Sequence, residues 1–108
     1  MDISEQCSIV PRMSNGIIAT YMVASLQGVL YTGFTVNLRD RIEQHRVGLG
    51  GEFSSLYRNS KLVWCEVAES IESAREREAQ IKRWRRSKKV WLIERENPYW
   101  EDISWKVN

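Results

Sequence analysis

The sequence has few of the residues that build disulfide-rich, zinc-binding or membrane-spanning proteins. Its 108 residues include two cysteines, two prolines and one histidine. The cysteines, Cys7 and Cys65, lack the CxxC spacing of a zinc site, although they could pair with each other. No apolar run approaches the roughly 20 residues that cross a bilayer, and the N-terminus, with Asp2 and Glu5, is unlike a secretory signal. These absences favour a reducing, cytoplasmic setting and no membrane association.

The composition of the chain is that of an ordinary globular protein, but its charges are unevenly distributed. Hydrophobic residues make up 43% and charged residues 28%, which suits one domain with a modest core. Residues 73–89 carry eight basic and two acidic side chains, or +6, so the rest of the chain carries −4 to give the total of +2. Such a segment can attract a polyanion, but a solvated helix face explains it equally well.

The pattern of apolar residues predicts a loose extension over residues 1–16, within which Met13 could be the native start, and a folded domain over 17–108. The predicted strands cover 17–25, 29–34 and 61–67. The predicted helices run from the Asn37 cap to about residue 47, onward from the Ser70 cap, and from Lys88, after a Ser87 cap, to about Glu96. The order ββαβαα is typical of an α+β fold, a small sheet with helices packed on it.

Local signals refine these elements. Gly28 can take the positive φ of a hairpin turn between the first two strands. Gly33 leaves a gap beside Tyr31 where another group could approach the backbone. Asp40 lies in the first turn of the helix that Asn37 caps, and Arg41 and His45 share one face of that helix. The glycine-rich stretch 48–60 is a predicted loop.

One carboxylate stands out in the helix that follows Ser70. The apolar stripe of this helix reads Ile71, Ala74, Glu78 and Ile81, so Glu78 falls on the apolar face. A carboxylate there costs a few kcal/mol or more if it is left ionised and unpaired. A place at the edge of the stripe would explain Glu78 without any function, but a bound cation would explain it too.

Tyr31, Arg41 and Glu78 each have an ordinary structural explanation, but together they fit phosphodiester hydrolysis. That reaction needs a base for the attacking water and a cation for the developing charge. A tyrosine serves as the base only where a nearby cation lowers its pKa from about 10. Arg41 offers a permanent charge with a geometry suited to phosphate, and Glu78 offers an oxygen ligand for Mg²⁺ or Mn²⁺.

Several stretches in order resemble the GIY-YIG nuclease domain, and most of all its stand-alone, single-domain bacterial members. They are ATYMVAS and LYTG in the first two strands, FSSLY at Phe53–Tyr57, LVWCE at Leu62–Glu66, REAQIKRWRR at Arg77–Arg86 and LIERENPYWEDI at Leu92–Ile103. The resemblance spans about Ile18 to Ile103, nearly the whole folded part. It implies a small three-stranded antiparallel sheet flanked by helices.

The resemblance also implies an active site. Tyr21 and Tyr31 would be the tyrosines of the first and second motifs, with Tyr31 as general base. Arg41 would stabilise the phosphate, Glu78 would bind one Mg²⁺ or Mn²⁺ ion, and His45 would lie near the scissile phosphate. Two departures are visible: only the tyrosine of the first motif is kept, and Phe34 stands where some relatives have a lysine.

The sequence therefore predicts a metal-dependent endonuclease that cleaves DNA, or RNA as a second substrate, with little sequence specificity, in DNA repair or recombination. Its nucleic-acid-binding residues are predicted to be Arg75, Lys82, Arg83, Arg85, Arg86, Lys88 and Lys89. One alternative is a nucleic-acid-binding module with the same fold and little or no activity. Another is a protein-interaction domain that uses Trp84, Trp91, Trp100 and Trp105, although most of these tryptophans are expected in the core.

Overall fold

The computed structural model describes residues 16–47 and 60–107 of the protein. Within these ranges the elements are β1 (Ala19–Ala24), β2 (Leu30–Thr35), α2 (Leu38–Val47), β3 (Lys61–Val67), α4 (Ile71–Lys82), α5 (Arg86–Glu96) and the 3₁₀ helix η1 (Ser104–Val107). In this described part the sheet has three strands in the order β2-β1-β3, and both pairings with β1 are antiparallel. The predicted α+β fold, a small antiparallel sheet flanked by helices, is confirmed.

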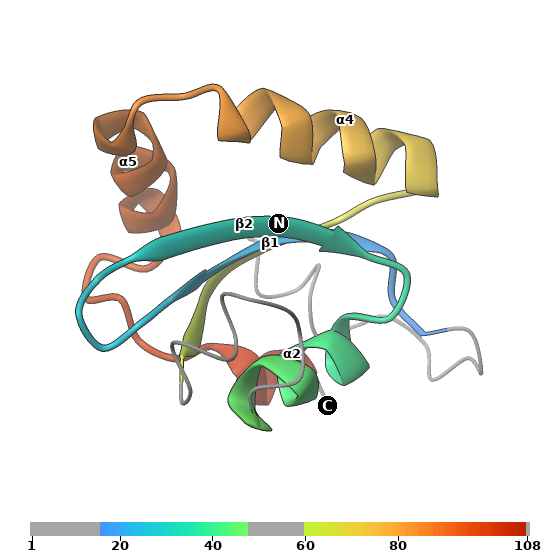
Figure 1. Cartoon of the computed structure of the whole chain (residues 1–108), viewed down its shortest axis with the longest axis horizontal. Coiled ribbons are helices and arrows are strands. Elements are labelled where there is room, and N and C mark those ends of the chain that lie inside the picture. The colour runs from blue at the N-terminus through green and yellow to red at the C-terminus, as the bar shows by residue number, and fades with distance from the viewer. Residues whose placement is uncertain (1–15, 48–59, 108) are drawn as a thin grey trace.

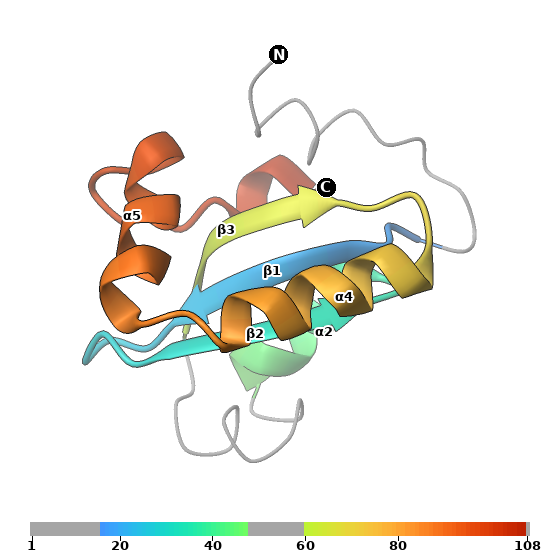
Figure 2. The ribbon, with the colours of Figure 1, turned by 90° about the horizontal axis from the view of Figure 1, so that it is seen from above.

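The helices form layers on both faces of the sheet. Helices α4 and α5 lie over one face, whereas α2 and η1 lie against the other (Figure 1). Seen from above, α4 runs along the strands on the side of β2 (Figure 2), and it packs on β2 and β1. Because side chains alternate along each strand, the sheet sends one set of apolar residues to each layer. Together with apolar residues from outside the strands, they form two core clusters. The cluster on the α2 face consists of Ile17, Ala19, Tyr21, Val23, Leu38, Ile42, Leu62, Cys65 and Ile103. The cluster on the α4 face consists of Met22, Ala24, Val63, Trp64, Ile81, Leu92 and Ile93.

Short polar signals mark several ends of elements as predicted. The side-chain Oδ1 of Asn37 accepts a hydrogen bond from the Asp40 backbone N–H (3.2 Å), and the side-chain Nδ2 of Asn37 donates to the Asp40 carboxylate (3.0 Å). Ser70 caps α4 in a reciprocal arrangement with Ser73. Gly28 has a φ of 86° in the turn between β1 and β2, a conformation that glycine adopts without strain. These boundaries are set by local chemistry, which explains why the sequence predicts them.

The predicted start of α5 is wrong. The helix begins at Arg86 with Arg85 as N-cap, and no side chain caps it, so Ser87 lies inside the first turn. The strand limits also differ by one or two residues: β1 is shorter at both ends than predicted, and β2 is shifted one residue onward. Only β3 matches at both ends.

The C-terminal segment folds back on the sheet, but not through all of its aromatic residues. The Ile103 backbone N–H donates to the Leu62 carbonyl oxygen (2.8 Å), and the Asn97 side-chain amide donates to the Val63 carbonyl oxygen (3.1 Å). Trp100 packs partly against the core. Trp91 and Trp105 remain 53% and 67% exposed, so the expectation that most tryptophans belong to the core is wrong for these two.

Some sequence predictions lie outside the described residues: the extension over 1–15 with Met13, and the loop over 48–59 with Phe53 and Tyr57. Cys65, buried on β3, is disulfide-bonded, whereas the sequence favours a reducing setting while leaving a disulfide open. No helix in the described ranges is long and apolar enough to cross a membrane.

Candidate active site

A pair of tyrosines on β1 and β2 forms the floor of the candidate site. Tyr21 is opposite Gly33 and Tyr31 is opposite Val23 in the β1–β2 register. The two tyrosine rings are tilted by 46°, with their centroids 6.4 Å apart. Tyr21 is fully buried, whereas Tyr31 is half-buried. Of the two, Tyr31 therefore offers the hydroxyl that solvent and a substrate can reach more readily.

Gly33 provides the space in which these rings meet. A Cβ atom at this position would lie 2.8 Å from the Tyr21 hydroxyl oxygen and 2.9 Å from Cε2 of Tyr31. Real Cβ atoms do not approach other heavy atoms so closely, so a larger residue would push at least one ring away. The sequence predicts a gap beside Tyr31, and in the structure the hydroxyl of Tyr21 fills it.

Arg41 reaches Tyr21 from α2. Burial raises the pKa of Tyr21 far above its ordinary value, and the neighbouring Tyr31 raises it further, whereas the charge and the hydrogen bond of Arg41 lower it. The charge of Glu78 also raises the pKa of Tyr21. Burial has the largest effect, so the Tyr21 hydroxyl stays protonated at neutral pH. This suits Tyr21 to positioning or to donating a hydrogen bond rather than to taking a proton from water.

Glu78 enters the site from α4 together with a lysine. Its carboxylate lies 2.6 Å from the Lys82 ammonium, and the side chain of Glu78 is only 15% exposed while that of Lys82 is 49% exposed. The same ammonium lies 5.8 Å from the centroid of the Tyr31 ring. The hydrogen bond to Glu78 raises the pKa of Lys82, and burial partly offsets this effect. Lys82 therefore links the carboxylate of α4 to the tyrosine of β2.

The structure thus brings four of the predicted site residues together from four elements: Tyr21 from β1, Tyr31 from β2, Arg41 from α2 and Glu78 from α4. The side chain of His45 lies outside the part that the structure describes, so its role stays a prediction. Lys82 is a fifth member, which the sequence assigns only to nucleic-acid binding. Its spacing of four residues from Glu78 signals the ion pair, but its approach to Tyr31 depends on how α4 packs along β2.

The Glu78 carboxylate fits a metal ion such as Mg²⁺, which needs few ligands from the protein. Among the described residues, no group of three or more histidine, cysteine, aspartate or glutamate side chains could hold a metal. Mg²⁺ in phosphate-processing sites is often held by one or two carboxylates, with waters and substrate phosphates as the other ligands. Glu78 suits this arrangement, provided that Lys82 yields its place on the carboxylate.

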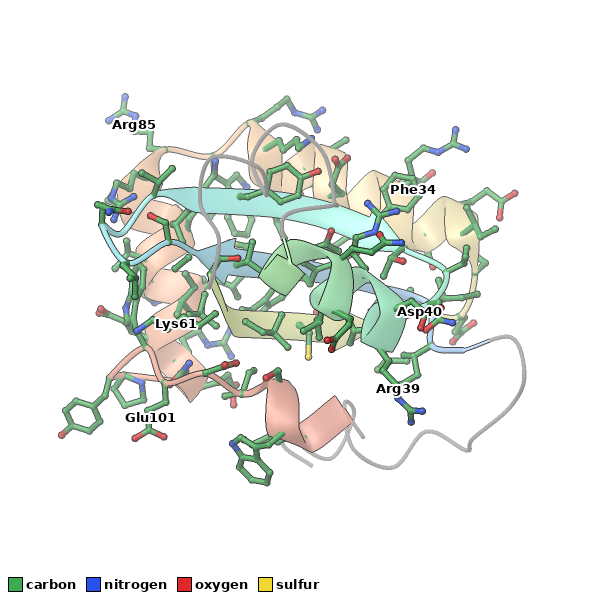
Figure 3. The ribbon with its side chains drawn as sticks, turned by 60° about the horizontal axis from the view of Figure 1, so that its bottom comes forward. Phe34, Arg39, Asp40, Lys61, Arg85 and Glu101 are labelled. Carbon is green, nitrogen blue, oxygen red and sulfur yellow. The ribbon has the colours of Figure 1, made fainter. Side chains whose placement is uncertain are left out.

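Most of the predicted nucleic-acid-binding residues lie on the surface of α4, α5 and their connection. Arg75, Arg83, Arg85, Arg86 and Lys88 are exposed, and Lys89 is half-buried. Arg85 points outward at the corner between α4 and α5 (Figure 3). Two of these cations rest on tryptophans: Lys88 lies 4.3 Å from the centroid of a Trp84 ring, and Arg86 lies 6.0 Å from that of Trp100.

Arg77, a basic residue of the same segment, is bound by side chains of the domain itself. The Arg77 guanidinium donates to the Glu66 carboxylate (3.0 Å) and to the Gln80 side-chain oxygen (2.6 Å). It also lies over the rings of Trp64 and Trp84. These contacts give Arg77 a structural role within the domain.

Comparison with known proteins agrees with this architecture. The family model described as the GIY-YIG catalytic domain matches residues 17–90. A UPF0213 protein of Syntrophus aciditrophicus (strain SB) is 38% identical over 79 residues, which cover 72% of this chain and 90% of that protein. A UPF0213 protein of Staphylococcus aureus (strain Mu3 / ATCC 700698) is 37% identical over 73 residues, which cover 68% and 89% of the two chains.

A solved structure shares the fold. The UPF0213 protein BH0048 from Bacillus halodurans, determined by solution NMR, has a TM-score of 0.53 and 27% sequence identity, covering 79% of this chain and 90% of that one. The matches extend over most of each relative, as expected for the stand-alone, single-domain type that the sequence resembles. The chain belongs to the GIY-YIG family, a family of nucleases, and within it to the UPF0213 proteins.

Proposed function

We propose that this protein is a divalent-metal-dependent endonuclease that hydrolyses the phosphodiester bonds of DNA with little sequence specificity. The observation that carries this proposal is the convergence of Tyr31, Glu78 and Lys82 at the edge of β2, beside Tyr21 and Arg41. A base candidate, a metal-ligating carboxylate and fixed positive charge are the groups that phosphodiester hydrolysis requires. We also propose DNA repair or recombination in the cytoplasm as its setting, with RNA as a second substrate that shares the phosphate chemistry.

In this mechanism the two tyrosines have different tasks. Tyr31, which is half-buried, takes a proton from the attacking water. Tyr21, which burial keeps protonated, holds the Arg41 side chain and the substrate in place. Arg41 stabilises the negative charge that develops on the phosphate, because its planar guanidinium matches phosphate oxygens. His45 assists the proton transfer in this proposal.

Glu78 would hold one Mg²⁺ or Mn²⁺ ion. When bound, the ion would supply positive charge beside the phosphate and polarise its oxygens. The low exposure of the Glu78 side chain strengthens the interaction of its carboxylate with any cation, because solvent screens buried charges less than exposed ones.

Binding of DNA would rest on the exposed basic residues around the corner between α4 and α5. Lysine and arginine contacts to phosphate carry no sequence information, so binding would be largely independent of sequence. It would also weaken steeply with salt, since each phosphate contact releases counterions. The reliance on phosphate contacts accounts for the low sequence specificity in the proposal.

A supercoiled plasmid tests the proposal directly. The full-length protein is incubated with plasmid and Mn²⁺, with and without a chelator, beside the Glu78→Ala variant. We expect nicking by the wild type that the chelator abolishes, and binding without nicking by Glu78→Ala. A salt-dependent gel shift with no nicking by the wild type would favour the alternative, a binding module, which the exposed basic surface on α4 and α5 would also support.

A further inference from the structure

The ion pair between Glu78 and Lys82 is unlike an ordinary pair on a helix surface. Glutamate and lysine four residues apart commonly form a weak, exposed pair worth about 0.2–0.5 kcal/mol. Here the Glu78 side chain is 15% exposed, and its carboxylate oxygen is only 2.6 Å from the ammonium. A carboxylate with so little access to water depends on its partner, because burial of an unpaired charge is costly.

The surroundings of Lys82 allow its ammonium to move away from the Glu78 carboxylate. The Lys82 side chain is 49% exposed, so water is available to solvate its ammonium wherever it moves. Its other described contact is with the face of the Tyr31 ring at 5.8 Å, near the outer limit for a cation–π interaction. The flexible four-carbon stem of lysine allows the charge to swing away without any movement of the backbone.

A metal ion and the Lys82 ammonium compete for the same carboxylate. Both are hard cations that need a Glu78 oxygen, and two positive charges on one partly buried carboxylate repel each other. Metal binding at Glu78 therefore works against the contact with Lys82.

We propose that Lys82 is a built-in counter-ion of Glu78, which keeps the carboxylate paired in the free protein and which a divalent cation must displace. This inference rests on the proposed function, since it takes Glu78 to be the metal ligand. It assigns Lys82 to the metal site in addition to the DNA-binding surface. It implies that the protein binds metal weakly by itself, because each binding event also breaks an ion pair.

The test measures metal binding without DNA. The full-length wild type and Lys82→Met are titrated with Mn²⁺, and free Mn²⁺ is followed by electron paramagnetic resonance. We expect Lys82→Met to bind Mn²⁺ more tightly, by on the order of fivefold, the scale of a modest ion pair. Lys88→Met is the matched control, because it removes the same charge from a lysine that lies over Trp84; its affinity should stay close to that of the wild type.

Two more variants separate the possible failures. Lys82→Arg keeps the charge and should bind Mn²⁺ as the wild type does, even if Lys82→Met is poorly folded. Glu78→Gln should lose Mn²⁺ binding. If Glu78→Gln loses binding but Lys82→Met gains no more than Lys88→Met, or Lys82→Arg binds as tightly as Lys82→Met, the counter-ion role is overturned and the proposed function stands. If Glu78→Gln binds Mn²⁺ like the wild type, the metal assignment in the proposed function is itself overturned.

A second readout comes from cleavage. Lys82→Met should reach half of its maximal nicking rate at a lower Mn²⁺ concentration than the wild type does, whatever its maximal rate. An unchanged or higher Mn²⁺ requirement in this variant would contradict the displacement of Lys82.

Discussion

Helix α4 carries an ion pair along each of its two edges, and the surroundings of the two pairs differ. Toward β3, Arg77 and Glu66 are 27% and 37% exposed, and Arg77 is held further by Gln80 and two tryptophan rings. Toward β2, Lys82 and Glu78 are 49% and 15% exposed, and the lysine lies over the ring of a proposed catalytic tyrosine.

The difference indicates that an ion pair on α4 can serve either the stability of the fold or the active site. A guanidinium with several fixed partners stabilises the packing of α4 on the sheet, since its planar fork is held at many points. A half-exposed ammonium on a partly buried carboxylate can give up its place to another cation. We therefore expect substitutions at the β3 edge to change stability and substitutions at the β2 edge to change activity.

The largest effect should follow the loss of the Tyr31 hydroxyl. Tyr31→Phe keeps the ring against Tyr21 but removes the proposed base, so nicking of supercoiled plasmid should fall by at least about 100-fold. The unfolding midpoint in urea should stay close to that of the wild type. Tyr99→Phe is the matched control, because Tyr99 is 83% exposed and far along the chain from the site; it should nick normally. Normal nicking by Tyr31→Phe would remove this tyrosine from the mechanism.

Gly33→Ala should be an exception to this division between the edges, because it lowers stability although Gly33 lies on β2. The added methyl would lie 2.8 Å from the Tyr21 hydroxyl and 2.9 Å from the Tyr31 ring. Overpacking of this kind costs about 1–3 kcal/mol, which urea unfolding would measure. Gly28→Asn, in the β1–β2 turn, should lose less, since asparagine tolerates a positive φ. A Gly33→Ala variant as stable as the wild type would contradict the close packing of both tyrosine rings around Gly33.

Arg77→Met tests the β3 edge. It removes the ion pair with Glu66 and the contacts with two tryptophan rings, so the free energy of unfolding should fall by about 1 kcal/mol. Plasmid nicking should not change. Arg83→Met, at an exposed position after α4, is the control that should keep full stability. If Arg77→Met lost nicking while it remained folded, the division between the two edges would be wrong.

The smallest effect concerns the buried Tyr21 at high pH. Burial raises the pKa of Tyr21 in the folded state, so the neutral hydroxyl favours folding fully below the unfolded pKa of about 10 and loses this effect as the pH rises further. Between pH 9 and pH 11 the wild type should lose roughly 1 kcal/mol more unfolding free energy than Tyr21→Phe. Equal losses in urea titrations of the two proteins would show that Tyr21 ionises freely in the fold.

The sequence predicts those features of the fold that short-range chemistry decides. Asn37 and Ser70 end up as caps, and Gly28 as a turn residue with positive φ, because each acts on its immediate neighbours. The start of α5 is mispredicted because Arg85 occupies the N-cap without any side-chain bond. The exposure of Trp91 depends on which face of α5 the sheet covers, and no local pattern reports this.

The candidate site divides in the same way. Glu78 can be singled out from the sequence because a carboxylate on an apolar stripe is unusual within a single helix. The position of Lys82 beside Tyr31 cannot be predicted from the sequence, because it follows from the path of α4 along β2. The filling of the Gly33 gap by the Tyr21 hydroxyl likewise depends on the β1–β2 register.

The most direct measurement compares the carboxylates of the two ion pairs. Glu78→Gln and Glu66→Gln make the same isosteric change on the two edges, and both proteins are assayed for nicking of supercoiled plasmid in Mn²⁺ and for DNA binding by gel shift. We predict that Glu66→Gln nicks within about threefold of the wild type, whereas Glu78→Gln loses at least about 100-fold with its DNA binding intact. Normal nicking by Glu78→Gln would contradict the assignment of this carboxylate to the active site.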